Sequence, residues 1–426
     1  MIRELVVLLD RKEAGRIHRN TAGKLFFIYD DAWRSSPLSY PISLSMPLSS
    51  AEHGHARMEG FLWGLLPDNQ RILERWAGRF HVSAKSAFGL IAAVGEDCAG
   101  AIQFVRPERL EYALSGKPRR GEVTWLDESG VAERLRTLRL DSSVWRMAGD
   151  TGQFSLAGAQ AKTALLFEDG RWGVPSGRLP TTHILKPPLR DFDGHVENEH
   201  FCLLLAGSLG FPVPRSEVMR FDDQPAIVVE RYDRIRLQGS LWRVHQEDLC
   251  QALGVSSLKK YENEGGPGVR RTVELLRMHS TERDQDVATF VDSLIFNWLM
   301  AGTDAHAKNF SLLLSAAGAV RLAPLYDMAS VLPYKHMDPL RVKLAMKIGG
   351  VYRMRDVRAR QWEKLAGELN LNPGQTLARV RALAGMLPDH VSAVQKQFQG
   401  ADLSHPAVER LAERLVARAR KCLKMV

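Results

Sequence analysis

The chain contains the stretch Gly-Thr-Asp-Ala-His-Ala-Lys-Asn-Phe at residues 302–310, its densest cluster of polar side chains. This stretch directly follows apolar residues that recur at helical spacing: Val287, Phe290, Val291, Leu294, Ile295 and Trp298. That periodicity predicts a helix with one buried face. An acid, an imidazole and an amide at the end of a buried element are costly unless they meet a ligand. The stretch therefore indicates a binding or catalytic site.

The spacing of Asp304 and Asn309 can be interpreted in two ways. The two residues are five apart, as are the catalytic-loop Asp and Asn of protein kinases. In kinases the Asp orients the substrate hydroxyl or accepts its proton, and the Asn holds Mg²⁺. The alternative is a helix C-terminus whose polar side chains only form hydrogen bonds. The spacing alone does not separate the two.

Asp327 is a second candidate acid and follows the apolar run from Leu322 to Tyr326. Together with Ser330 it fits a helix cap. It equally fits a metal-holding acid, because Mg²⁺ prefers oxygen ligands and shares them with phosphate. Its place is analogous to the acid of the kinase Asp-Phe-Gly motif, although Met328 and Ala329 replace Phe and Gly.

Lys186 ends the predicted strand 182–186, where it either reaches nucleotide phosphates or is a solvated charge. The helix expected after it carries two acids. We predict that Glu199 forms the ion pair that orients Lys186, with Glu197 as the alternative. Upstream, residues 155–163 (Ser-Leu-Ala-Gly-Ala-Gln-Ala-Lys-Thr) are rich in small residues, so their backbone amides could wrap phosphates. The stretch lacks the second glycine of a Walker A loop, and by composition alone it is a turn.

The order of predicted elements indicates an α+β protein. A length of 426 residues predicts two or three domains. Strand-like runs at 5–9, 25–29 and 100–105, with a helix opening at 67–69, form a first module. Residues 114–121 have the composition of a linker. Strands at 164–167, 182–186 and 226–230, with a helix at 196–209, form a mixed part, and the chain is largely helical after residue 241.

The composition excludes several classes of protein. No apolar run approaches the ~20 residues that span a bilayer, and Leu5 to Leu9 is too short for a signal peptide, so we expect a soluble, cytoplasmic protein. The four cysteines lack metal-ligand spacing and predict neither a zinc site nor a disulfide framework. A net charge of +9 permits contact with nucleic acid without demonstrating it. A basic stripe on the last predicted helix is interpreted as a solvated face: Arg410, Arg414, Arg418 and Lys421.

Six segments together resemble the HipA family of toxin kinases, in order and in spacing. They are SLAGAQAKT (155–163), THILKP (182–187), Asn198-Glu199, ERYDR (230–234), TDAHAKNFS (303–311) and YDMAS (326–330). The resemblance covers nearly the whole chain. It implies a two-lobed, protein-kinase-like α+β fold with a mixed α/β N-lobe (111–240) and a mostly helical C-lobe (241–426). An N-terminal α+β module (1–110) would precede them.

The resemblance also implies a role for each site residue. Asp304 would be the catalytic acid/base, and Asn309 and Asp327 the Mg²⁺ ligands. The remaining ATP contacts would come from Ala157, Gly158, Ala159, Gln160, Ala161 and Lys162 in a phosphate-covering loop, from Lys186, from the hinge Glu230, Arg231 and Tyr232, and from His306, Ala307, Lys308 and Tyr326. Ser155 would be phosphorylated by the enzyme itself, which ejects the loop and inactivates the protein.

The implied activity is transfer of the ATP γ-phosphate to a protein serine or threonine, with an aminoacyl-tRNA synthetase as the target class. Such a toxin inhibits translation, arrests growth and confers drug tolerance. A helix-turn-helix antitoxin that binds operator DNA and represses transcription would be its partner, and no membrane is implied. Two alternatives remain: a catalytically inactive, nucleotide-sensing co-repressor in the antitoxin–DNA complex, and a small-molecule kinase on a similar fold.

Overall fold

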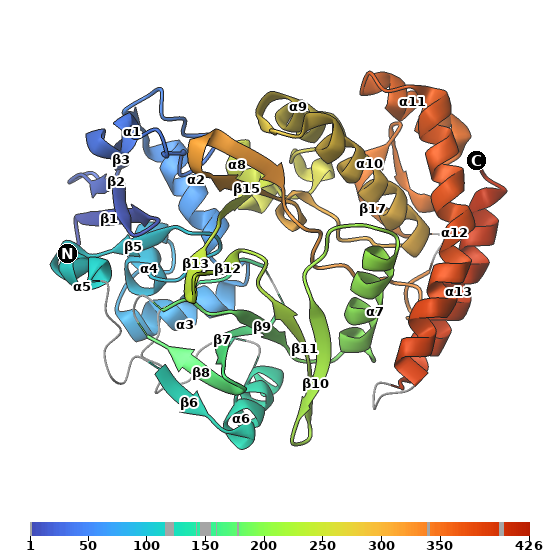
Figure 1. Ribbon diagram of the computed structural model, residues 1–426, viewed down its shortest axis with the longest axis horizontal. Helices are drawn as coiled ribbons and strands as arrows, with labels where there is room; N and C mark the ends of the chain where they lie inside the picture. The colour runs from blue at the N-terminus through green and yellow to red at the C-terminus, as the bar shows by residue number, and fades with distance from the viewer. Residues whose placement is uncertain are drawn as a thin grey trace.

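The computed structural model describes residues 2–115, 123–141, 143–144, 155–158, 160–176, 179–338, 341–399 and 404–426. It has three parts: in Figure 1 the N-terminal strands and helices lie on the left, the strands from β6 to β11 lie towards the middle, and the last helices lie on the right. An α+β module comes first, a six-stranded sheet lies in the middle, and a mostly helical part ends the chain. The predicted linker at 114–121 falls largely outside the described residues.

The N-terminal module is built on a five-stranded antiparallel sheet with the order β4-β3-β2-β1-β5. The strands are β1 (Glu4–Leu9), β2 (Lys12–Arg19), β3 (Leu25–Tyr29), β4 (Glu52–His53) and β5 (Gln103–Val105). The helices are α1 (Asp31–Ser35), α2 (His55–Leu65), α3 (Gln70–Phe80), α4 (Ala87–Val94) and α5 (Leu110–Leu114). The side chain of Asn69 caps α3 by accepting from the amide of Arg71. The three strands and the helix start predicted from the sequence are confirmed.

The middle part is a six-stranded sheet with the order β10-β11-β9-β7-β8-β6. Its strands are β6 (Val123–Leu126), β7 (Thr163–Glu168), β8 (Arg171–Pro175), β9 (His183–Lys186), β10 (Ser216–Phe221) and β11 (Gln224–Glu230). Its helices are α6 (Glu128–Leu140) and α7 (His195–Ser208). Helix α7 lies between this sheet and the C-terminal helices (Figure 1). Because β9 pairs with both β7 and β11, Lys186 at its end lies in the centre of the sheet.

The last part is mostly helical, as the sequence predicts. Its helices are α8 (Leu249–Ala252), α9 (Val269–His279), α10 (Arg283–Met300), α11 (Ala359–Glu368), α12 (Pro373–Gln399) and α13 (Pro406–Leu423). Its short strands are β12 (Arg234–Leu237), β13 (Ser240–Arg243), β14 (His245–Asp248), β15 (Ser311–Ser315), β16 (Ala319–Leu322), β17 (Lys343–Ile348) and β18 (Val351–Arg353). The apolar stripe at 287–298 lies in α10 and is buried.

Two arginines of α13 correct the interpretation of its basic stripe. Arg418 donates to the carbonyl of Leu299 at 3.0 Å and to that of Trp298 at 2.6 Å. These are the unpaired carbonyls at the end of α10, where the helix dipole also favours a cation. Arg414 donates to the carbonyl of Leu332. The prediction of a solvated face is therefore wrong for both residues, and Arg418 fixes the helix end from which the polar stretch 302–310 begins.

The N-terminal module is packed into the protein rather than tethered to it. One continuous hydrophobic core includes residues of its sheet, of α7 and of α10. Leu156 and Ala161, on either side of Gly158, belong to the same core. All four cysteines are free and buried. Among the described residues, no helix is both long enough and apolar enough to cross a membrane.

Candidate active site

A cavity of about 590 Å³ lies where the three parts meet. Most of the predicted site residues line it: Ala157, Gly158, Gln160, Lys162, Lys186, Glu199, Glu230, Arg231, Tyr232, Asp304, His306, Lys308, Asn309, Tyr326 and Asp327. Ala161 and Ala307 are buried beside it. Ala159 lies outside the described residues. The structure thus gathers side chains from segments up to about 170 residues apart around one space.

Lys186 lines this cavity and is held between two carboxylates. Its Nζ lies 2.6 Å from Oε1 of Glu199 and 2.7 Å from Oδ1 of Asp327. Of the two acids considered from the sequence, Glu199 is the one that forms this ion pair. Burial alone would lower the pKa of Lys186, but Asp327 and Glu199 raise it, so the ammonium stays charged.

Helix α7 supplies Glu199 and is itself tied to the segment that follows Asp327. The side chain of Asn198 donates to the carbonyl of Ser330 at 2.7 Å and accepts from its amide at 3.1 Å. Both hydrogen bonds are buried. The adjacent Asn198 and Glu199 therefore fix α7 against both Lys186 and the Asp327 segment, which explains why the two residues occur as a pair.

Asp327 is not a helix cap, because residues 323–330 form neither helix nor strand. Its backbone lies in the left-handed region, with φ of +56°, which is uncommon for a residue with a side chain. Burial would raise its pKa, but Lys186 and Lys162 hold it well below its usual range. Asp327 is thus an ionised carboxylate with only Oδ1 bonded to Lys186, and its second oxygen can take a cation.

Asp304 is an exposed acid of the site, with 62% of its side chain accessible. Its carboxylate accepts from the hydroxyl of Tyr261 at 2.6 Å, and His306 Nε2 lies 3.7 Å from the same oxygen. Asn309 donates its amide nitrogen to the main-chain carbonyl of Asp304 at 2.7 Å, which leaves the amide oxygen for another ligand. The turn therefore presents a carboxylate and an amide oxygen to the cavity.

The loop at residues 155–162 is docked against the N-terminal module. Ser155 is fully buried; its hydroxyl donates to the carbonyl of Leu65 at 2.7 Å, and its amide donates to the carbonyl of Asp97 at 2.9 Å. Gly158 has φ of +108°, and a Cβ there would lie 2.7 Å from Nζ of Lys162. A φ in this range is strained for any residue with a side chain, which is why glycine suits the position. Burial first, and Lys186 second, lower the pKa of Lys162 to about 8.

The predicted hinge is largely engaged in protein contacts. The amides of Glu230 and Arg231 donate to the carbonyls of Arg215 and Thr182, both at 2.9 Å, so neither can bind a base without losing a bond. Tyr232 stacks on Tyr326, with ring centroids 5.8 Å apart. The aromatic pair lines the cavity, and the role of the hinge stays a prediction.

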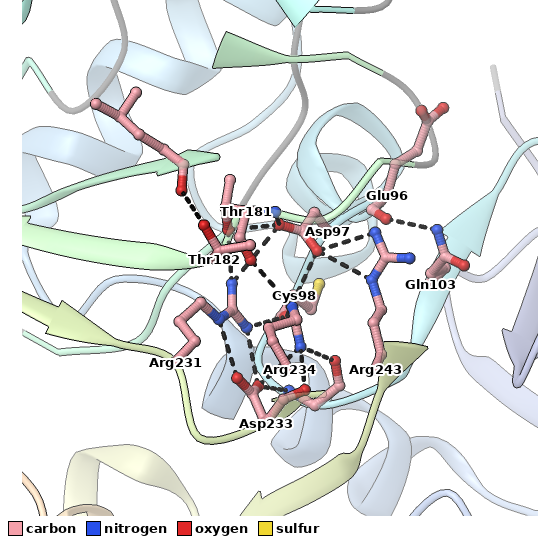
Figure 2. A network of polar contacts seen from close by, with 12 residues as sticks. Glu96, Asp97, Cys98, Gln103, Thr181, Thr182, Arg231, Asp233, Arg234 and Arg243 are labelled. Atoms are coloured by element: carbon pink, nitrogen blue, oxygen red, sulfur yellow. Dashed lines mark hydrogen bonds and ion pairs between the residues drawn. The ribbon is translucent and has the colours of Figure 1, made fainter. Parts of the chain in front are cut away.

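Three side chains of the ERYDR segment, those of Arg231, Asp233 and Arg234, form a buried ion-pair network that includes Asp97 of the N-terminal module (Figure 2). Asp97 lies 3.0 Å from Arg234 and 3.1 Å from Arg243, and it accepts from Thr181 at 2.8 Å. Arg231 pairs with Asp233 at 2.9 Å. The guanidinium of Arg231 is thus directed into this network, and it joins the hinge to the N-terminal module.

Several residues of the site were missed by reasoning from the sequence. Asp68 was considered only as part of a helix start, although it forms ion pairs with Lys260 and Lys308. Tyr261 and Asp97 belong to none of the motifs recognised in the sequence. Their partners in these contacts are 43 to 240 positions away along the chain, so no local sequence pattern indicates them.

Comparisons with known proteins agree with this arrangement. Residues 5–105 match the family described as "HipA N-terminal domain", and residues 154–395 match "HipA-like C-terminal domain". The chain is 35% identical over 422 residues to "Putative kinase Y4mE" of Sinorhizobium fredii, covering 98% of each chain. It is 30% identical over 388 residues to "Serine/threonine-protein kinase toxin HipA" of Shewanella oneidensis, covering 88% of this chain and 85% of the relative.

A solved structure shows the same fold. The chain superposes with a TM-score of 0.84 and 26% identity on the Shewanella oneidensis HipA of a complex with HipB and operator DNA, covering 99% of this chain and 98% of that one. The predicted two-lobed, kinase-like α+β fold is confirmed. Both family domains lie in their expected order along one chain. This protein belongs to the HipA family of kinases.

Proposed function

We propose that the protein is a serine/threonine protein kinase toxin that transfers the γ-phosphate of ATP to another protein. One observation carries the proposal: Lys186, bonded to both Glu199 and Asp327, lies in the same cavity as the turn from Asp304 to Asn309. This is the set of groups that kinases use to hold phosphates, a metal ion and an acceptor hydroxyl.

The cavity has the chemistry that a nucleoside triphosphate requires. Two lysines, Lys162 and Lys186, lie beside a loop of small residues, where cations and amides can neutralise phosphate oxygens. Among the described residues, buried Nε2 of Gln160 finds no hydrogen-bond partner, as expected for a donor that meets a ligand. The stacked pair of Tyr232 and Tyr326 offers an aromatic wall for a base.

The residues present also fit Mg²⁺. Asp327 is ionised, and Asn309 keeps its amide oxygen available, so these two residues would hold the ion together with phosphate oxygens. Within the described residues no group of three or more His, Cys, Asp and Glu could hold a metal ion. Two protein ligands suffice for a magnesium ion that is shared with a nucleotide. When bound, it would neutralise charge on the transferred phosphoryl group.

The protein's own contribution is mostly positioning. Lys186, oriented by Glu199, fixes the phosphates, and Asp304 orients the acceptor hydroxyl and takes its proton. The exposure of Asp304 leaves its carboxylate accessible to a protein substrate. The hydroxyl of Tyr261 holds one carboxylate oxygen in place, and the other oxygen stays available for that proton.

The relatives supply the proposed setting. Because the Shewanella HipA was solved with HipB and operator DNA, we propose a small DNA-binding antitoxin and its operator as partners of this chain. A net charge of +9 is compatible with that contact. The proposed target is an aminoacyl-tRNA synthetase, whose modification would stop translation and growth, and phosphorylation of Ser155 would inhibit the enzyme.

Growth inhibition on expression is expected to depend on the ion-paired residues. Lys186→Ala and Asp327→Ala should each relieve it, because without them the phosphates are neither held nor neutralised. Colony counts after induction, at equal protein levels, measure the effect. Asp223→Asn, which changes an exposed ion pair with Arg136 far from the cavity, serves as the control and should remain toxic. Toxicity that persists in both cavity variants would favour the alternative, a catalytically inactive co-repressor.

ATP affinity is expected to fall as the pH rises from about 7 to about 9. Lys162 has a pKa of about 8, so its charged form predominates below that value and is lost above it. Lys186 stays charged throughout, because its pKa is raised. ATP titrations across this range should show the decrease in the wild type. In Lys162→Met the affinity should be weaker and nearly independent of pH; an unchanged slope would exclude Lys162 as its source.

A further inference from the structure

Asp68 connects three segments that are far apart in the sequence. It lies in the N-terminal module, between α2 and α3. Its Oδ1 is 2.6 Å from Nζ of Lys308, and its Oδ2 is 2.9 Å from Nζ of Lys260. Its backbone amide donates to the carbonyl of Gly158 at 3.0 Å. One residue thus contacts the turn at residues 304–309, here called the catalytic turn, with its side chain and the phosphate-covering loop with its backbone.

The ion pair with Lys308 is buried and well placed to act on the catalytic turn. The side chain of Lys308 is 3% exposed and that of Asp68 is 16% exposed. Burial would raise the pKa of Asp68, but Lys308 and Lys260 lower it, so the carboxylate is ionised. An ion pair this enclosed is screened far less than a surface pair. Breaking it would leave the ammonium of Lys308 without its carboxylate partner.

Lys308 also contacts the segment that carries Asp327. It lies between Asp304 and Asn309 in sequence, and its carbonyl accepts from the hydroxyl of Tyr326 at 2.8 Å. Tyr326 in turn immediately precedes Asp327. A displacement of Lys308 would therefore move the proposed base and both proposed metal ligands relative to the phosphate-covering loop.

We propose that Asp68 is a positioning residue through which the N-terminal module aligns the catalytic turn with the phosphate-covering loop. The proposal rests on the proposed kinase function. The carboxylate restrains Lys308, while the backbone amide anchors Gly158 independently. Replacing only the carboxylate should therefore slow the chemical step and leave nucleotide binding largely intact. If Asp68 only anchored the loop, the replacement would instead weaken nucleotide binding and leave the chemical step unchanged.

The test compares Asp68→Asn with a matched control, Asp141→Asn. Asp141 forms an ion pair at 2.5 Å with Arg75 of the same N-terminal module, but this pair is exposed and away from the cavity. For Asp68→Asn we expect kcat for labelled-phosphate transfer to fall about 10- to 50-fold, since small misplacements of reacting groups have effects of this order. KM for ATP should change less than about threefold. Asp141→Asn should match the wild type in both.

Two further measurements separate positioning from a general loss of structure. In the double variant of Asp68→Asn with Lys308→Met, the effect on kcat should be no larger than that of Lys308→Met alone, because both changes break the pair between Asp68 and Lys308, through which the proposal has Asp68 act. Amide hydrogen exchange at residues 304–310 should be faster in Asp68→Asn than in the wild type, but not in Asp141→Asn. This measurement does not require the protein to be active. If Asp68→Asn does not fold, Lys308→Gln breaks the same pair from the other side.

The outcomes distinguish the proposals. Wild-type kcat in Asp68→Asn, additive effects in the double variant, or unchanged exchange at 304–310 would each overturn the positioning role. A large loss of ATP affinity at unchanged kcat would mean that Asp68 only anchors the phosphate-covering loop, and it would also overturn the positioning role. Absence of phosphate transfer by the wild type would instead refute the proposed function, and the exchange measurement would then decide the inference by itself.

Discussion

Asp304→Asn is expected to lower the rate of phosphate transfer by at least about a thousandfold, within the range contributed by a positioned general base. The amide cannot take the proton of the acceptor hydroxyl. The substitution should preserve the fold, because an amide oxygen still accepts from Tyr261 and Asn309 bonds only the main-chain carbonyl of residue 304. Transfer of labelled phosphate from ATP, by purified protein at equal concentration, measures the effect.

The control for this variant is another Asp→Asn change on the helix that precedes the turn. Asp292 lies in α10 and pairs with Arg379 at 2.7 Å, outside the cavity. Asp292→Asn should transfer phosphate at close to the wild-type rate. Asp304→Asn should still bind ATP and should unfold at close to the wild-type temperature. A rate above about a thousandth of the wild-type value would exclude Asp304 as the base.

Phosphorylation of Ser155 is expected to weaken ATP binding by at least about tenfold, because each lost hydrogen bond to a charged phosphate oxygen costs about 1.5–3 kcal/mol. In the structure Ser155 is fully buried; its hydroxyl donates to the carbonyl of Leu65, and its amide donates to the main-chain carbonyl of Asp97. A phosphoryl group adds almost two negative charges and three acceptor oxygens near neutral pH. It cannot remain beside these acceptors, so the loop must leave its docked position. Lys162 and the loop amides leave with it, and the phosphates lose those contacts.

Ser155 must also become exposed before it can be modified, so the reaction should occur between molecules and accelerate with protein concentration. Mass spectrometry of protein incubated with ATP and Mg²⁺ locates the phosphate, and ATP titration of the modified and unmodified forms measures the affinity. Ser155→Ala should resist inactivation. The switch would be excluded by absence of phosphate on Ser155, or by equal ATP affinity of the two forms.

Much of the fold was predictable because its signals are local. The helical periodicity at 287–298 and the strand-like run before Lys186 each lie within one element, and the structure contains both as α10 and β9. Glu199 could be named as the partner of Lys186 because the helix that carries it follows the strand directly. The division into lobes and their order along the chain were predicted from the resemblance to the HipA family, because periodicity alone does not give them.

The rest of the site depends on contacts that no local pattern reveals. Asp68 meets Lys308 across 240 residues of sequence, and Arg234 meets Asp97 across 137. Arg418 appears as part of an exposed stripe in its own helix, and only the position of α10 shows that its guanidinium binds carbonyls. Asp327 was open to interpretation as a cap because its left-handed backbone is not encoded by its neighbours in any recognised pattern.

Incubation of the purified wild-type protein with γ-labelled ATP and Mg²⁺ tests the central claim most directly. If the cavity around Lys186, Asp304 and Asp327 is a phosphotransfer site, label should appear covalently on serine or threonine, first on Ser155 of the protein itself. Omitting Mg²⁺ should prevent the transfer. A protein that binds ATP yet transfers no phosphate, either to itself or to proteins of its own cell extract, would contradict the account and leave a nucleotide-sensing binding protein.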